Sequence, residues 1–150
     1  MPNESEPQAR GTDPFRHARI GRFAWIVFAL LLVLPAIAAF RLSNTIDWKV
    51  LAGVPLVMSI LTFLAYRTDK RHAQSGKWRI PESTLHILEL GYGWPGALLG
   101  QRRYRHKTTK VSFQVVYWLV VLLHQFVALD YLLHWAFLGG VLHVVRTHAG

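Results

Sequence analysis

Long stretches without a single charged residue constrain this chain more than any other feature. Residues 23–40 form a run of 18 uncharged, mostly apolar residues, and residues 50–66 form a second such run. At about 1.5 Å per residue, a helix of this length spans roughly 27 Å, close to the thickness of a bilayer's hydrocarbon core. Two further apolar runs, 111–129 and 131–145, are separated only by Asp130. The pattern predicts an all-α integral membrane bundle with about four transmembrane helices.

The charged residues lie between these runs. The chain has 17 Lys and Arg residues against 8 Asp and Glu residues, with a formal net charge of +9. Residues 1–22 are polar and lack apolar periodicity, so we predict a disordered cytoplasmic tail before a membrane domain over 23–150. The chain has no cysteine, which excludes disulfides, thiolate metal sites and cysteine nucleophiles. Such basicity suggests anionic partners, although membrane topology alone can also produce it.

Residues 81–100 form the ambiguous element. Pro81 and Glu82 are typical of a helix start, but Gly91, Gly93 and Pro95 predict a break in the middle. If both ends of this broken helix lie on one side, that side holds every Lys and Arg except Arg41 and Lys49. If it spans instead, the basic residues divide almost evenly, against the positive-inside bias. We therefore favour a re-entrant or interfacial helix and a multi-pass chain with a cytoplasmic N-terminus.

We expect helices at about 23–40, 50–66, 81–100 (broken), 111–129 and 131–145. Residues 67–82 are hydrophilic and basic, and we predict a loop there. The last two apolar runs together are too long for one spanning helix, so we expect a tight turn with Asp130 at the outer surface.

Three ionisable side chains share a face of the broken helix. Glu82, His86 and Glu89 stand at positions i, i+4 and i+7, so two carboxylates and an imidazole project together. Such a group could hold a divalent cation or shuttle a proton. The spacing matches no established ligand signature, and the simpler interpretation is the wet face of an amphipathic interfacial helix. We predict no metal site and no cofactor.

A basic stretch follows the broken helix. Its side chains are well suited to phosphate oxygens, and together with Arg79 it supplies the candidate anion-binding residues Arg102, Arg103, Arg105, Lys107 and Lys110. Three interpretations are open: binding of anionic phospholipid headgroups, topological anchoring alone, and nucleic-acid binding. Only one aromatic residue, Tyr104, interleaves these charges, too few for a base-stacking platform.

Polar residues also occur inside the apolar runs. Gln114, Tyr117 and Gln125 lie along one stripe with His124 at its edge, and His134 and His143 follow. Polar groups in lipid need partners, so we expect interhelical hydrogen bonds; a haem, quinone or proton path is the alternative. Asp130 and His134, at i and i+4, can pair with each other.

The middle of the chain resembles a bacterial membrane-protein family of unknown function, some of whose members carry an N-terminal cold-shock domain. The resemblance covers roughly residues 51–123. It rests on Asp69, Lys70, Ala73, Gly76, Trp78, Arg79, Ile80, Pro81, Glu82, Leu85, Gly93, Trp94, Pro95, Gly96, Ala97, His106, Lys107, Thr108, Lys110 and Phe113. It implies a small inner-membrane protein and no established activity. Tyr92 departs from the pattern, because the family usually has a glycine there.

Our leading hypothesis is a non-enzymatic inner-membrane protein whose cytoplasmic face, residues 67–110, binds anionic headgroups, a protein partner or a second copy. One alternative is an enzyme acting on a lipid or isoprenoid through Glu82, His86, Glu89 and His106. Another is a small transporter or proton path using Gln114, His124 and His134. A nucleic-acid role, by analogy with relatives fused to a cold-shock domain, is weakened because we expect no such domain before this segment.

Overall fold

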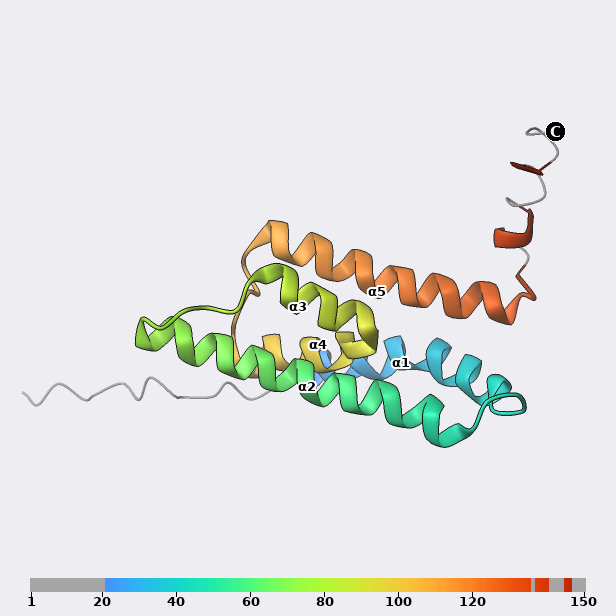
Figure 1. Ribbon diagram of the computed structural model, residues 1–150, viewed down its shortest axis with the longest axis horizontal. Coiled ribbons are helices and arrows are strands. Elements are labelled where there is room, and N and C mark those ends of the chain that lie inside the picture. The colour runs from blue at the N-terminus through green and yellow to red at the C-terminus, as the bar shows by residue number, and fades with distance from the viewer. Residues whose placement is uncertain (1–20, 136, 141–144, 147–150) are drawn as a thin grey trace, which may run out of the picture.

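The protein is helical throughout the part that the structure describes. A computed structural model describes residues 21–135, 137–140 and 145–146 of the 150 residues, and contains no strand within these ranges. Its elements are α1 (Arg22–Leu42), α2 (Trp48–Ser75), α3 (Glu82–Leu88), the π-helical η1 (Glu89–Gly93), α4 (Trp94–Tyr104) and α5 (Val111–Leu132) (Figure 1). The prediction of an all-α chain is confirmed. The tail expected over 1–22 lies outside the described residues as far as residue 20.

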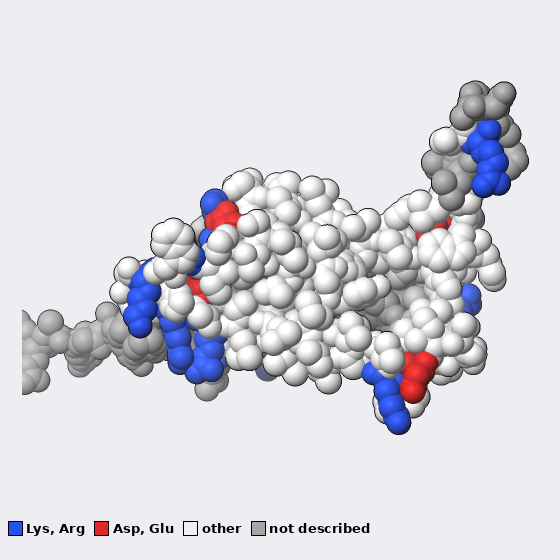
Figure 2. Space-filling view, in the orientation of Figure 1, with Lys and Arg blue, Asp and Glu red and all other residues white. Residues whose placement is uncertain are grey.

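In the described part of the chain, three helices are long and apolar enough to cross a membrane. They are α1, α2 and α5, with mean hydropathies of 2.6, 1.8 and 1.7 in their most apolar windows. Figure 2 shows the consequence: charged side chains gather at the two ends of the molecule, and an uncharged band lies between them. A fourth expected span, 131–145, falls partly outside the described residues.

The broken helix reverses direction at η1. Gly91 and Tyr92 leave the helical region there, with φ −76° and ψ 32° for Gly91 and φ 70° and ψ 11° for Tyr92. Figure 1 shows that α3 enters the bundle from the end where α2 stops and that α4 returns to the same end. The predicted break is therefore confirmed, and α3, η1 and α4 form a helical hairpin. The expected single segment 81–100 extends to Tyr104.

The hairpin packs closely against α2 because small residues face that helix. A methyl group added at Gly96 would lie 1.8 Å from the carbonyl oxygen of Ser59, and one at Gly93 would lie 2.0 Å from Oγ1 of Thr62. Such close approach of two backbones is typical of membrane helix packing. The core lies in this half of the bundle, between α2, the hairpin and α5, with Tyr66, Leu85, Trp94, Phe113 and Tyr117 among its buried side chains.

The prediction of a loop over 67–82 was wrong for its first half. Helix α2 continues through the basic residues to Ser75 and ends at Gly76, whose φ of 66° is the left-handed conformation that glycine adopts at helix ends. Charged residues end the part of a helix that lipid can surround, but Lys and Arg are good helix formers in water. The last turns of α2 therefore carry charge without losing helical structure.

The position predicted for Asp130 was also wrong. Helix α5 runs past it to Leu132, and the Asp130 side chain is fully buried. Its carboxylate accepts hydrogen bonds from the backbone N–H groups of Phe137 at 2.8 Å and Leu138 at 3.2 Å. A turn in apolar surroundings has unpaired N–H groups that need an acceptor, and Asp130 supplies it. His134 leaves the helix with φ 59°, and the described contacts of Asp130 replace the expected Asp130–His134 pair.

Candidate functional site

A buried carboxyl group lies at the turn of the hairpin. Glu89, in η1, is fully buried, and its Oε1 accepts a hydrogen bond of 2.5 Å from the Tyr66 hydroxyl of α2. Its Oε2 lies 2.7 Å from Nδ1 of His86, one turn earlier in α3. The His86 ring in turn lies against Phe113 of α5, with ring centroids 4.3 Å apart. Both oxygens of this carboxyl are therefore occupied by side chains of the protein.

The hydrogen bonding continues from Tyr66 across the bundle to α5. Gln101 of α4 donates through Nε2 to the Tyr66 hydroxyl at 3.1 Å. Gln114 of α5 donates to Oε1 of Gln101 at 2.6 Å and to the carbonyl oxygen of Lys107 at 2.9 Å. These side chains connect α2, the hairpin and α5 in one continuous polar network, which in a lipid environment keeps each buried group paired.

A second buried pair lies at the end of the bundle where α2 finishes. Asp69 of α2 is fully buried; its Oδ1 accepts from the backbone N–H of Ile80 at 3.0 Å, and its Oδ2 accepts from Nε2 of His106 at 2.7 Å. Burial lowers the pKa of the His106 imidazole from its usual value, although the Asp69 carboxylate opposes this shift. Burial thus favours the neutral form of His106, and the pair ties the α2–α3 and α4–α5 connections to one helix.

Glu82, at the start of α3, forms an ion-pair cluster with two lysines. It contacts Nζ of Lys107 and lies 2.8 Å from Nζ of Lys110. Hydrogen bonds from Lys107 and Lys110 lower the pKa of Glu82 to about 2. The ammonium of Lys107 also lies 5.4 Å from the centre of the Phe113 ring, a cation–π contact. Two of the predicted anion-binding residues thus already have an acidic partner in the protein.

Other basic side chains of this end face outward. Arg79, Arg102 and Arg105 are exposed, whereas Arg103 is half-buried and has contacts of its own. Beside Arg79, Trp78 is 88 % exposed, unusual for so large an apolar ring. Figure 2 shows Lys and Arg side chains gathered at the end of the molecule where α2 finishes. We call this surface, Trp78, Arg79, Arg102 and Arg105, the basic end.

The four candidate catalytic residues do not form one cluster. Glu82 pairs with lysines, His86 pairs with Glu89, and His106 pairs with Asp69. Within the described ranges, no three His, Asp or Glu side chains come together in a way that could hold a metal ion. Glu82, His86 and Glu89 were predicted to act together, but Glu82 contacts lysines whereas His86 and Glu89 contact each other.

The prediction of interhelical hydrogen bonds is confirmed for Gln114, Tyr117 and Gln125 of α5. Besides Gln114, Tyr117 donates to the carbonyl oxygen of Trp94 at 3.3 Å, and Gln125 donates to that of Leu31 in α1 at 2.8 Å. His124 instead bonds the carbonyl oxygen of Val120 in its own helix. His143 lies outside the described residues.

Sequence reasoning missed Tyr66 and Gln101, the two side chains that link Glu89 to α5. Tyr66 is the last residue of an uncharged run, and Gln101 directly precedes the basic residues Arg102 and Arg103, so neither position predicts a buried hydrogen bond. Tyr66 and Asp69 stand at i and i+3, so they share a face once α2 is known to continue past residue 66. That spacing could have indicated a shared buried face, but it has this meaning only in a helix, and a loop was predicted over 67–82.

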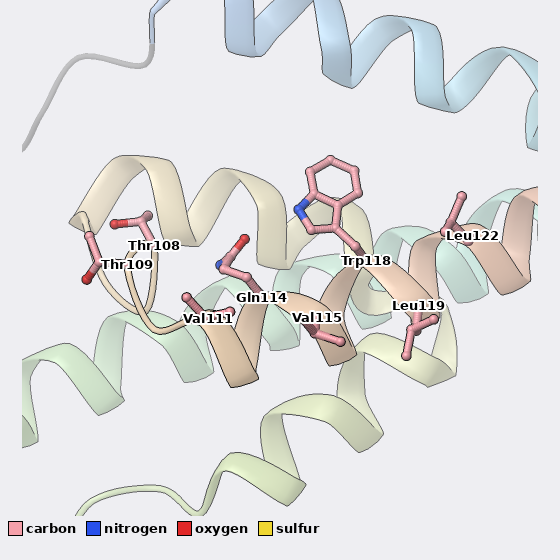
Figure 3. Close-up of a pocket in the computed structure, with 8 residues that line it drawn as sticks. All are labelled: Thr108, Thr109, Val111, Gln114, Val115, Trp118, Leu119 and Leu122. Carbon is pink, nitrogen blue, oxygen red and sulfur yellow. The ribbon is translucent and has the colours of Figure 1, made fainter.

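A groove runs along the first part of α5 and the loop before it. It has a volume of about 400 Å³ and is lined by residues between Thr108 and Leu122. Figure 3 shows Thr108, Thr109, Val111 and Gln114 toward one end of the groove, and Val115, Trp118, Leu119 and Leu122 farther along the helix. The indole of Trp118 projects from α5 on the side where α1 lies. The polar end of this groove adjoins the loop that carries Arg105 and Lys107.

Comparisons with known proteins identify relatives of the segment that holds these contacts. The sequence profile of the family described as "Protein of unknown function (DUF1294)" matches residues 59–113. The "Uncharacterized protein YsdA" of Bacillus subtilis (strain 168) is 35% identical over 65 residues, which cover 43% of this chain and 73% of that protein. No solved structure matches the chain. The matched segment contains both buried pairs, the Glu82 cluster and the hairpin.

Proposed function

This chain belongs to the DUF1294 family, and we propose that it is a multi-pass inner-membrane protein whose basic end binds anionic phospholipid headgroups on the cytoplasmic side. In this proposal α1, α2 and α5 cross the bilayer, and the hairpin of α3, η1 and α4 enters the membrane and returns to the same side. The basic connections before α3 and after α4 then both face the cytoplasm, in agreement with the positive-inside bias.

The observation that carries this proposal is the contrast among the basic side chains themselves. Lys107 and Lys110 are compensated by Glu82, whereas Arg102 and Arg105 are exposed beside one end of an apolar bundle. Guanidinium groups match phosphate geometry, and an exposed Trp such as Trp78 is typical of the headgroup level of a bilayer. An anionic headgroup would supply the countercharge at this position.

The buried pairs favour this function over an enzymatic one. Both oxygens of Glu89 and both oxygens of Asp69 are bonded to groups of the protein, and both side chains are fully buried. A substrate could reach them only after the hairpin moved away from α2. Their contacts instead hold the hairpin and the two basic connections in place.

The proposal is tested by removing two exposed charges without disturbing the ion pairs. The double variant Arg102→Gln and Arg105→Gln is purified in detergent, and its bound phosphatidylglycerol and phosphatidylcholine are compared by native mass spectrometry. Each basic group near an anionic surface contributes about 1 kcal/mol, so the loss of two, about 2 kcal/mol, should lower the preference for phosphatidylglycerol by roughly thirtyfold.

The matched control is Arg41→Gln with Lys49→Gln, which removes the same charge from the opposite end of the bundle. It should keep the preference of the unmodified protein. An unchanged preference in the Arg102 and Arg105 variant, or an equal loss in both variants, would rule out a headgroup site at the basic end.

A further inference from the structure

The groove on α5 is polar at one end and apolar along the rest of its length. Thr108 and Thr109 bring hydroxyl groups to one end, and Gln114 brings an amide. Beyond Gln114 the lining is apolar, through Val115, Leu119 and Leu122. Because α5 is one of the three candidate membrane spans, the apolar part lies where the surrounding solvent is hydrocarbon.

The polar end of the groove has a defined hydrogen-bonding character. The amide nitrogen of Gln114 donates to Gln101 and to the carbonyl oxygen of Lys107, so Gln114 offers a ligand only its carbonyl oxygen, an acceptor. The hydroxyls of Thr108 and Thr109 can donate to phosphate oxygens. Arg105, three residues before Thr108 in the same connection, carries a positive charge on an exposed side chain. Donors, positive charge and one acceptor fit a phosphodiester that carries a hydroxylated headgroup.

We propose that this groove binds one anionic phospholipid, with its phosphate at Thr108 and Thr109 and one acyl chain along α5 between Val115 and Leu122. This rests on the proposed function and extends it: the basic end provides general attraction for anionic lipid, whereas the groove selects and orients a single molecule. The volume of about 400 Å³ lies within the range of ordinary small-molecule sites and suits part of one chain.

The first test fills the apolar part of the groove. Leu119→Trp adds a ring inside it, and Leu123→Trp adds the same ring at an exposed position of α5 that does not line it. Native mass spectrometry with dioleoyl phosphatidylglycerol should show that the Leu119 variant retains its most tightly bound lipid roughly tenfold less well than the Leu123 variant. Equal retention by the two variants would overturn the proposal.

The second test addresses the polar end with a change that keeps side-chain shape. Thr108→Val with Thr109→Val removes two hydroxyls, and should lower the preference for phosphatidylglycerol over phosphatidylcholine severalfold while chain binding persists. An unchanged preference would overturn the assignment of the phosphate to this end. If the basic end is a headgroup site but the groove is not, the Arg102 and Arg105 variant loses preference. In that case Leu119→Trp retains lipid as Leu123→Trp does, and Thr108→Val with Thr109→Val keeps the preference of the unmodified protein.

Two further outcomes exclude other occupants. Glycerol 1-phosphate, which has no acyl chains, should not compete with the lipid at millimolar concentration; effective competition would mean that the groove is not needed. A protein that is dimeric as purified and becomes monomeric only with Leu119→Trp would show that a second copy fills the groove, which also contradicts the proposal.

Discussion

Helix α1 and the α3–η1–α4 hairpin differ in opposite directions in how apolar they are and how deeply they are buried. Helix α1 is the most apolar of the candidate spans, yet only 6% of its most apolar window is buried inside the protein. The hairpin contains Glu89, Gln101 and several glycines, and it forms the centre of the core. In water the apolar helix would be inside. In the proposed membrane setting lipid covers α1, whereas the polar groups of the hairpin are covered by protein that can bond them.

The comparison predicts that backbone contact in the hairpin matters more than apolar character. Gly96→Leu should produce the largest loss, more than about 4 kcal/mol, because its side chain would overlap the backbone of Ser59. Size-exclusion chromatography and thermal unfolding in detergent would show aggregation or a collapsed transition. Gly53→Leu is the control, since nothing lies within 4 Å of a methyl group added there. Equal behaviour of the two variants would mean that α2 and α4 are not in close contact.

Removing the buried carboxylate of Asp69 should have the next largest effect. Asp69→Ala leaves His106 and the N–H of Ile80 without their acceptor in a buried place, at a cost of about 3 kcal/mol. The thermal midpoint in detergent should fall by roughly 6–12 °C for a chain of this size. Asp47→Ala, which removes an exposed helix cap, should cost only about 1 kcal/mol. A smaller loss at Asp69 than at Asp47 would contradict the arrangement.

His106 should make folding stability depend on pH. Because burial lowers its pKa, the unfolded chain binds a proton below pH about 6.5 that the folded protein does not bind. Its stabilising contribution is complete above that pH and is lost as the pH falls toward the lowered pKa. Between pH 7.5 and 5.5 the thermal midpoint of the unmodified protein should fall by a few degrees more than that of His106→Gln. Parallel pH profiles would show that the imidazole is not held neutral.

The smallest predicted effect concerns Tyr92 at the turn of the hairpin. Its φ of 70° is unfavourable for any side chain and neutral for glycine. Tyr92→Gly should therefore be more stable than Tyr92→Ala by about 1 kcal/mol, whereas in a regular helix alanine would be the more stable of the two. Thermal unfolding of both variants measures the difference. Greater stability of the alanine variant would mean that residue 92 is helical.

The positions of the helices could largely be predicted from the sequence, whereas the partners of the buried polar groups could not. Uncharged runs located α1, α2 and α5, and Gly91 and Gly93 located the break. The partners of the buried groups could not be predicted: Tyr66 and Glu89 are 23 residues apart, and Asp69 and His106 are 37 apart. Periodicity tells which face of a helix a residue occupies, but not which helix covers that face.

The error over residues 67–75 has a related cause. Hydropathy indicates where an apolar run ends, which need not be where the helix ends. The loop prediction for residues 67–75 treated the end of the run at residue 66 as the end of the helix. Asp69 was consequently assigned to a solvated loop, although it lies on the buried face of α2. The role of Asp130 was missed for a similar reason, because a carboxylate between two apolar runs is typical of a surface turn and also of a buried cap.

The central claim is that lipid surrounds the uncharged band and that both basic connections lie on the same side of it. The chain has no cysteine, so single cysteines at Lys77, Thr109 and Asn44 can be labelled without background. With a membrane-impermeant thiol reagent in sealed, oriented vesicles, Lys77→Cys and Thr109→Cys should be labelled from one side and Asn44→Cys from the other. Labelling of Lys77→Cys and Thr109→Cys from opposite sides would contradict the account.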